Sequence, residues 1–183
     1  MKRIISVVLL LVMAGVLFAG CGGTTKTEPA KKKIVIGLDD NFPPMGFKDE
    51  KNNIVGFDID MAKEAAKRLG IEVEFKGIDW SSKEAELNSK RIDALWNGMN
   101  ITEERKKNVL FSDPYMESKQ LIFVLANSPI KSAADLKGKV VGVQQSSIGE
   151  EVVTKDEKLK ATLKDFKKYP DCVAAFMDLK TGR

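Results

Sequence analysis

The stretch Arg91–Arg105, RIDALWNGMNITEER, decides how the rest of the chain is interpreted. Its first part, 92–96, is apolar enough for a buried strand, and Thr102 is a suitable N-cap for a helix that we expect to run to Asn108. The polar turn Asn97–Asn100 lies between them, and an arginine follows in the first helical turn. Ligands of α/β sheets bind at the carboxyl ends of strands. The turn is therefore where we expect a binding site.

Strand and helix patterns alternate along most of the chain. This alternation is typical of parallel sheets with right-handed crossovers, so the sequence predicts an α/β fold. Two more loops should then lie at the carboxyl ends of strands, 39–47 and 144–150. The expected strands cover residues 34–38, 71–75, 92–96, 119–126, 139–143 and 166–169, and the expected helices cover residues 58–69, 83–88, 102–108, 132–136, 151–163 and 171–179.

The amino terminus has a different character from the rest. Two basic residues precede an apolar run over 4–18, and small residues then lead into Cys21. These features indicate a secretory signal over residues 1–20. The alternative, a permanent membrane-anchoring helix, is disfavoured because spanning a bilayer takes about 20 apolar residues. Residues 21–33 are polar and contain Pro29, so we expect them to form a flexible tether.

The composition excludes several classes of function. Without residues 1–20 the chain has 28 basic and 26 acidic residues, which gives no reason to expect a nucleic-acid partner. It contains no histidine, which excludes catalytic nucleophiles that depend on one. With only two, distant cysteines a zinc site is also not expected. We therefore expect no metal and no cofactor.

Four stretches resemble the solute-binding proteins of polar amino-acid ABC importers, which are bacterial solute-binding protein family 3. The resemblance implies a periplasmic-binding-protein-like type II fold, with two lobes that each hold a mainly parallel sheet flanked by helices. It places lobe 1 at 34–116, lacking its carboxyl-terminal return segment, and lobe 2, incomplete, at 117–183. The four stretches are GFDIDMAKEAAKRLG (56–70), RIDALWNGMNITEERKKNVLFSDPY (91–115), DLKGKVVGV (135–143) and DLKTGR (178–183).

The stretch FAGCGG, 18–23, resembles the lipobox of bacterial lipoproteins, with Phe18 where that pattern usually has leucine. The resemblance implies that Cys21 is lipidated and becomes the first residue of the mature protein. The protein would then be anchored to the cell membrane on its extracytoplasmic side, in a periplasm or on the outer face of the plasma membrane.

The resemblance also implies roles for residues of the polar turn. Arg105 matches the arginine that clamps the ligand α-carboxylate, and a planar guanidinium suits that group better than an ammonium does. The alternative for Arg105 is a solvated arginine in the first helical turn. Asn97 and Gly98 match residues that line the pocket. Met99 matches a position whose carbonyl receives the ligand ammonium, and Asn100 stands where serine or threonine is common.

Further site residues come from the other loops. Phe42 and Trp80 match positions that sandwich the ligand side chain, although core packing remains an open alternative for Trp80. Asp39 matches an acidic position that meets a cationic or polar side chain, and aromatic faces also attract cations. Ser146 and Ser147 match hydroxyl residues that complete carboxylate binding after closure. We therefore expect a polar amino acid as ligand, with a cationic or long polar side chain.

The function that the resemblance implies is a lipid-anchored, monomeric receptor that delivers an amino acid to the membrane subunits of an ABC permease. In relatives DLKTGR leads into a strand whose final aspartate pairs with the ligand ammonium, so we expect the 183-residue chain alone to bind weakly or not at all. The alternative function is an enzyme like cyclohexadienyl or arogenate dehydratase on the same fold. That chemistry needs a general acid or base, and Asp39 is the main carboxylate of the expected cleft.

Overall fold

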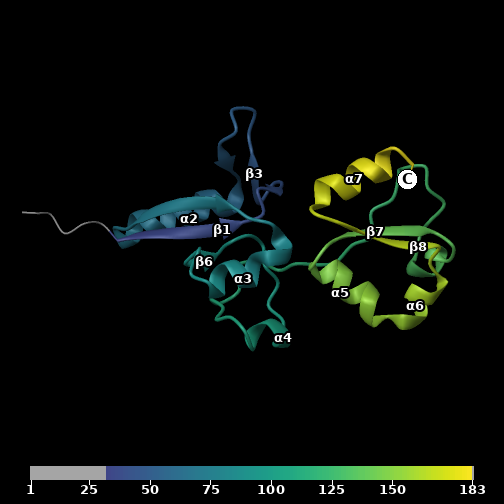
Figure 1. Cartoon of the computed structure of the whole chain (residues 1–183). Helices are drawn as coiled ribbons and strands as arrows, with labels where there is room; N and C mark the ends of the chain where they lie inside the picture. The colour runs from purple at the N-terminus through teal and green to yellow at the C-terminus, as the bar shows by residue number, and fades with distance from the viewer. Residues whose placement is uncertain (1–31, 183) are drawn as a thin grey trace, which may run out of the picture. The chain divides into compact units, whose positions relative to one another are not determined.

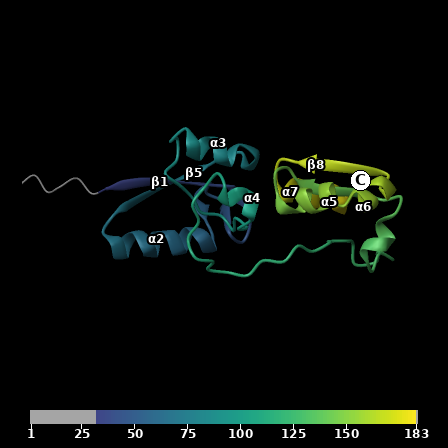
Figure 2. The ribbon, with the colours of Figure 1, turned by 90° about the horizontal axis from the view of Figure 1, so that it is seen from below.

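A computed structural model of the chain describes residues 32–182. The first sheet has the strand order β5-β1-β6, and both outer strands run parallel to the central one. Helices α2 (Phe57–Leu69) and α3 (Lys83–Asn88) lie on opposite sides of this sheet (Figures 1 and 2). The strands are β1 (Lys33–Leu38), β5 (Glu72–Gly77) and β6 (Ala94–Leu95).

The first sheet and α2 form as the sequence pattern predicts. Ile36 and Leu38 of β1 are fully buried, as a strand covered on both faces requires. Helix α2 buries an apolar stripe and ends at Gly70, which is left-handed at φ 64 and bonds the last carbonyls. Its amino-terminal cap is Gly56, and Asp58 lies buried in the first turn.

Residues between β1 and α2 form a small antiparallel sheet where the sequence predicts a loop. Its strands are β2 (Asn41–Phe42), β3 (Gly46–Lys48) and β4 (Ile54–Val55), in the order β2-β3-β4. Segments of two or three residues are too short to give an alternating pattern, so sequence reasoning misses them. Phe42 lies in β2 and pairs with Gly46 of β3.

A second, parallel sheet pairs β7 (Val140–Gln144) with β8 (Asp165–Tyr169). Helix α7 (Cys172–Lys180) covers one face, and α5 (Ile148–Lys155) and α6 (Glu157–Thr162) lie on the other (Figure 1). The single helix predicted over 151–163 is thus wrong in detail. Asp156 follows the end of α5 and caps α6, because its Oδ1 accepts a hydrogen bond from Leu159 N. This side-chain bond to the backbone replaces a continuous helix and so divides the segment in two.

Three short helical elements complete the fold. They are η1 (Trp80–Ser82), α4 (Glu103–Lys106) and η2 (Ala133–Leu136). The strand predicted over 119–126 is wrong, because no strand of residues 32–182 pairs with it. Apolar, extended sequence becomes a strand only where a neighbour supplies ladder hydrogen bonds. Leu121, Ile122 and Phe123 are instead exposed.

The predicted amino-terminal features fall largely outside the described residues. The signal segment and Cys21 lie there entirely, and the tether does so except for its last two residues, of which Lys33 already begins β1. Among residues 32–182 no helix combines the length and the apolar character needed to cross a membrane.

Candidate ligand-binding site

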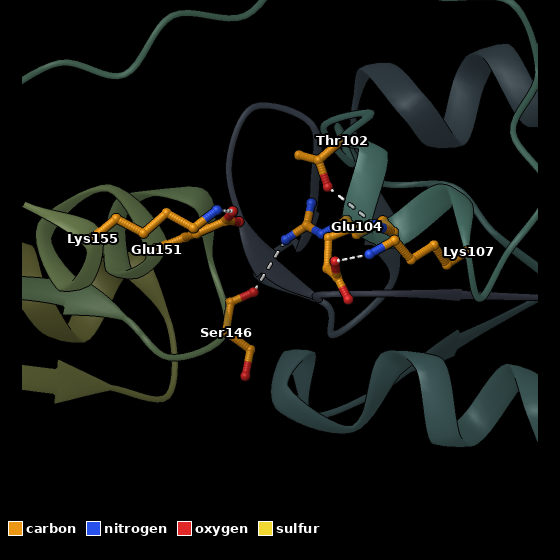
Figure 3. A network of polar contacts seen from close by, with 7 residues as sticks. Thr102, Glu104, Lys107, Ser146, Glu151 and Lys155 are labelled. Atoms are coloured by element: carbon orange, nitrogen blue, oxygen red, sulfur yellow. Dashed lines mark hydrogen bonds and ion pairs between the residues drawn. The ribbon is translucent and has the colours of Figure 1, made fainter.

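Arg105 is buried at the start of α4 and not solvated. Thr102 caps this helix by accepting a hydrogen bond from Arg105 N at 3.2 Å. The side chain is 8% exposed. Its Nη1 donates to the Asn100 carbonyl at 3.0 Å. Its Nη2 donates to the Ser146 carbonyl at 3.3 Å (Figure 3). Burial lowers the pKa of Arg105 from its usual high value, and the group stays charged.

A cleft of about 450 Å³ opens beside Arg105, a volume suited to a small molecule. Figure 3 shows Thr102 and Glu104 on one side of it, and Ser146, Glu151 and Lys155 on the other. The cleft is lined by Ser81, Lys83, Glu84, Thr102, Glu104, Arg105, Ser146, Ser147, Glu150, Glu151, Thr154 and Lys155.

The loop after β7 brings both predicted serines to the cleft. Ser147 caps α5, because its hydroxyl accepts a hydrogen bond from Glu150 N at 3.2 Å. Ser146 has a left-handed backbone at φ 58, and its amide donates to Glu150 Oε2 at 2.6 Å. Its carbonyl, rather than its hydroxyl, meets Arg105. Both residues line the cleft, and the groups they present there are a helix cap and a carbonyl.

Asp39 lies buried at the end of β1, outside the lining of the cleft. Its Oδ2 accepts a hydrogen bond from Gln144 Nε2 at 2.6 Å, and its Oδ1 accepts one from Asn41 N at 2.9 Å. Burial raises the pKa of Asp39, and the hydrogen bond from Gln144 opposes that rise. Gln144 is itself buried. The carboxylate thus already has a partner from the second sheet.

The polar turn contacts Asp39 and Phe42. Asn97 is buried, and its side-chain amide forms two hydrogen bonds with the Asp39 backbone. Its Oδ1 accepts from Asp39 N at 3.4 Å and its Nδ2 donates to the Asp39 carbonyl at 3.4 Å. Gly98 has φ +49, and a side chain there would meet the Phe42 ring at 3.5 Å. Met99 and Asn100 are half-buried. The structure therefore places Asp39, Phe42, Asn97 and Gly98 in one group, and Arg105, Ser146 and Ser147 in the cleft.

Trp80 is 7% exposed, and its ring faces Lys83, whose Nζ lies 5.0 Å from the ring centroid. Lys83 is a site residue that sequence reasoning missed. It is 4% exposed although it begins a charged surface helix, KEAELN. The local sequence gives no sign that Lys83 is buried, since a lysine on such a helix usually points to solvent. Among residues 32–182 no cluster of acidic residues and cysteine could hold a metal ion.

The family model of the bacterial extracellular solute-binding proteins, family 3, matches residues 34–169. This chain belongs to that family. The arginine-binding extracellular protein ArtP of Bacillus subtilis is 44% identical over 146 residues, which cover 78% of this chain and 57% of ArtP. The L-cystine-binding protein TcyJ of Escherichia coli is 34% identical over 181 residues, which cover 94% of this chain and 66% of TcyJ.

Solved structures of similar proteins are also amino-acid-binding proteins. An ancestral arginine-binding protein bound to arginine is 48% identical with a TM-score of 0.77, over 84% of this chain and 67% of that one. A substrate-binding protein of an ABC uptake transporter from Streptococcus pneumoniae, with bound histidine, is 38% identical with a TM-score of 0.78, over 81% and 62% of the two chains. These neighbours confirm the predicted type II fold class.

The comparisons also bear on the enzyme alternative. The relatives are binding proteins by name, which supports the expectation that this family member is not an enzyme. One structural neighbour, 35% identical with a TM-score of 0.76 and matching 82% of this chain and 66% of its own, is an ancestral amino acid-binding protein described as a precursor of cyclohexadienyl dehydratase. That neighbour, too, is named for binding. The chain spans 57% and 66% of the lengths of ArtP and TcyJ.

Proposed function

We propose that this protein is an extracytoplasmic receptor that binds a polar amino acid by its α-carboxylate at Arg105 and delivers it to an ABC importer. The observation that carries the proposal is the buried Arg105 guanidinium at the edge of a cleft. It forms no ion pair with any carboxylate of residues 32–182. A buried charge without an ionic partner is costly. A carboxylate ligand would supply that partner, with two oxygens that match the guanidinium fork.

The ligand side chain would extend toward the group formed by Asp39, Phe42, Asn97 and Gly98. A carboxylate and an aromatic face both favour a cation, so we propose arginine as the first candidate ligand. The names of relatives support this choice, because ArtP and an ancestral structural neighbour are both arginine-binding proteins. Trp80 contributes less to this choice, since its ring already faces Lys83.

The remaining parts of the proposal concern the whole protein. The chain would be held at the membrane by lipid on Cys21, act as a monomer and deliver its ligand to the membrane subunits of the permease. A family of extracellular solute-binding proteins supports such a location. Binding without turnover would separate this receptor from a dehydratase-like enzyme on the same fold.

The proposal is tested by titrating the full chain with each of the twenty amino acids, up to about 10 mM so that millimolar binding is detected. We expect arginine to raise the melting temperature and to give saturable heat on mixing. The variant Arg105→Gln should lose this response because the carboxylate loses its cation, whereas Arg68→Gln on the exposed surface of α2 should keep it. A wild-type chain that responds to glutamate more strongly than to arginine would contradict the proposal.

A further inference from the structure

Lys83 is a second buried cation beside Arg105. Its Nζ donates to the Trp80 carbonyl at 3.2 Å and to the Ser146 carbonyl at 3.1 Å. The same Ser146 oxygen also accepts the hydrogen bond from Arg105 Nη2. Two cations, carried by α3 and α4, therefore converge on one neutral oxygen atom of the loop that follows β7.

This pair of cations has no anion in contact with it. Neither side chain forms an ion pair within residues 32–182. Glu84 and Glu150 act on Lys83 only from a longer distance, while burial and Arg105 lower its pKa. The Trp80 ring and two carbonyl dipoles offset part of the cost of holding a second positive charge here.

A carboxylate fits this arrangement better than the Ser146 carbonyl does. It carries a full negative charge on two oxygens, so it can accept one hydrogen bond from an ammonium and another from a guanidinium. Both cations line the same 450 Å³ cleft, from which a ligand could reach them. The Ser146 carbonyl thus occupies the position at which an anion would be bound most strongly.

We propose that Lys83 binds the α-carboxylate of the ligand together with Arg105, and so determines specificity for ligands that carry a free carboxylate. This inference rests on the proposed function. The ligand replaces the Ser146 carbonyl on both cations. A purely structural lysine, which only ties the Trp80 carbonyl to the start of α3, would be indifferent to the carboxylate of the ligand.

The test compares arginine with argininamide, which lacks the carboxylate charge, on the full chain. Isothermal titration at low salt should show that Lys83→Met weakens arginine binding by about ten- to a hundredfold, the range for a hydrogen bond between charged groups. The same change should weaken argininamide binding by less than about threefold, since that ligand offers no anion. Lys83→Arg should keep most of the discrimination. The control Lys67→Met, at an exposed position of α2, should change neither affinity.

The outcomes separate this inference from the proposed function. A wild-type chain that binds argininamide as tightly as arginine overturns both, because the α-carboxylate then contributes nothing to binding. A wild-type chain that binds arginine, with a Lys83→Met variant that loses affinity equally for both ligands or for neither, overturns the role of Lys83 alone. A second measurement needs no variant: arginine should shift the side-chain ¹⁵Nζ resonance of Lys83 in the wild-type chain, and argininamide should not. Equal shifts with both ligands contradict the inference.

Discussion

Cys172 lies at the first turn of α7, against residues of the candidate site. Its thiol donates a weak hydrogen bond to Gln144 Oε1 at 3.5 Å. Burial, with smaller contributions from Asp39 and Asp171, raises the pKa of Cys172 to about 11. Only the thiolate reacts readily, so a raised pKa means a slow reaction near neutral pH.

We predict that the Cys172 thiol of the folded chain reacts with an aromatic disulfide reagent at pH 8 about a hundredfold more slowly than in the unfolded chain. At that pH about one thiol in a thousand is ionised if its pKa is 11, against roughly one in four for a free cysteine. The measurement uses a Cys21→Ser background so that one thiol remains. Equal rates before and after unfolding in urea would contradict the prediction.

Single residues also show how far sequence reasoning reaches. Arg105 was predicted because it stands at a fixed place in a recognisable motif, and the structure buries its side chain. Lys83 was not predicted, because its burial depends on a carbonyl 63 positions away in the sequence. Ser147 was predicted for its hydroxyl, which in the structure caps α5. Motifs locate residues, whereas the group that each residue presents depends on tertiary contacts.

At the scale of elements, a hydroxyl connects helix α2 to the polar turn. Tyr115 donates to Asp58 Oδ1 at 2.7 Å and accepts a hydrogen bond from Gly98 N at 3.2 Å. Asp58 is fully buried, and its second oxygen has no partner within the described part of the chain. Burial raises the pKa of Asp58, and the hydrogen bond from Tyr115 opposes this rise. Tyr115 is thus positioned to hold both the carboxyl and the turn.

We predict that Tyr115→Phe lowers the free energy of unfolding at pH 7 by about 1 to 3 kcal/mol, the cost of a buried polar group left without its partner. Loss of the hydrogen bond raises the pKa of Asp58 further, so the folded variant gains stability from protonation as the pH falls. The deficit should therefore be smaller at pH 4 than at pH 7, as measured by urea denaturation. Asp58→Asn, which keeps an acceptor for Tyr115 but removes the charge, should abolish this pH dependence. A deficit that is the same at both pH values would contradict the mechanism.

The helices and strands predicted from the sequence agree with the structure where the local pattern alone determines them. The helix predicted over 83–88 matches α3, and Gly70 ends α2 as expected. The strand predicted over 92–96 shortens to β6, because only Ala94 and Leu95 pair with β1. The segment 119–126 has the composition of a strand but no pairing partner among residues 32–182. Composition reports what a segment could form, and pairing decides what it does form.

At the scale of the whole molecule, alternation of strand and helix was enough to predict an α/β fold. It could not show that the strands divide into separate sheets, β5-β1-β6 and β7-β8. That division was implied by the family resemblance, and the solved structures of relatives support it. Polar contacts join the two sheets, such as that between Asp39 and Gln144 and that between Arg105 and Ser146. Contacts of this kind have no signature in a linear pattern.

The proposed lipid anchor at Cys21 would hold the whole molecule at the membrane. We predict that the chain expressed with residues 1–20 in a bacterial host is recovered in the membrane fraction and incorporates labelled palmitate. Because the Cys21 thiol is the group proposed to receive the lipid, Cys21→Ser should lose the label. Its recovery should shift from the membrane fraction to the soluble fraction, since acyl chains contribute about 0.8 kcal/mol of membrane affinity per buried methylene. The matched control is Cys172→Ser, which changes the only other cysteine. If both variants keep the label, or if Cys21→Ser alone keeps it, the chain is attached by some other means and the anchor has to be abandoned.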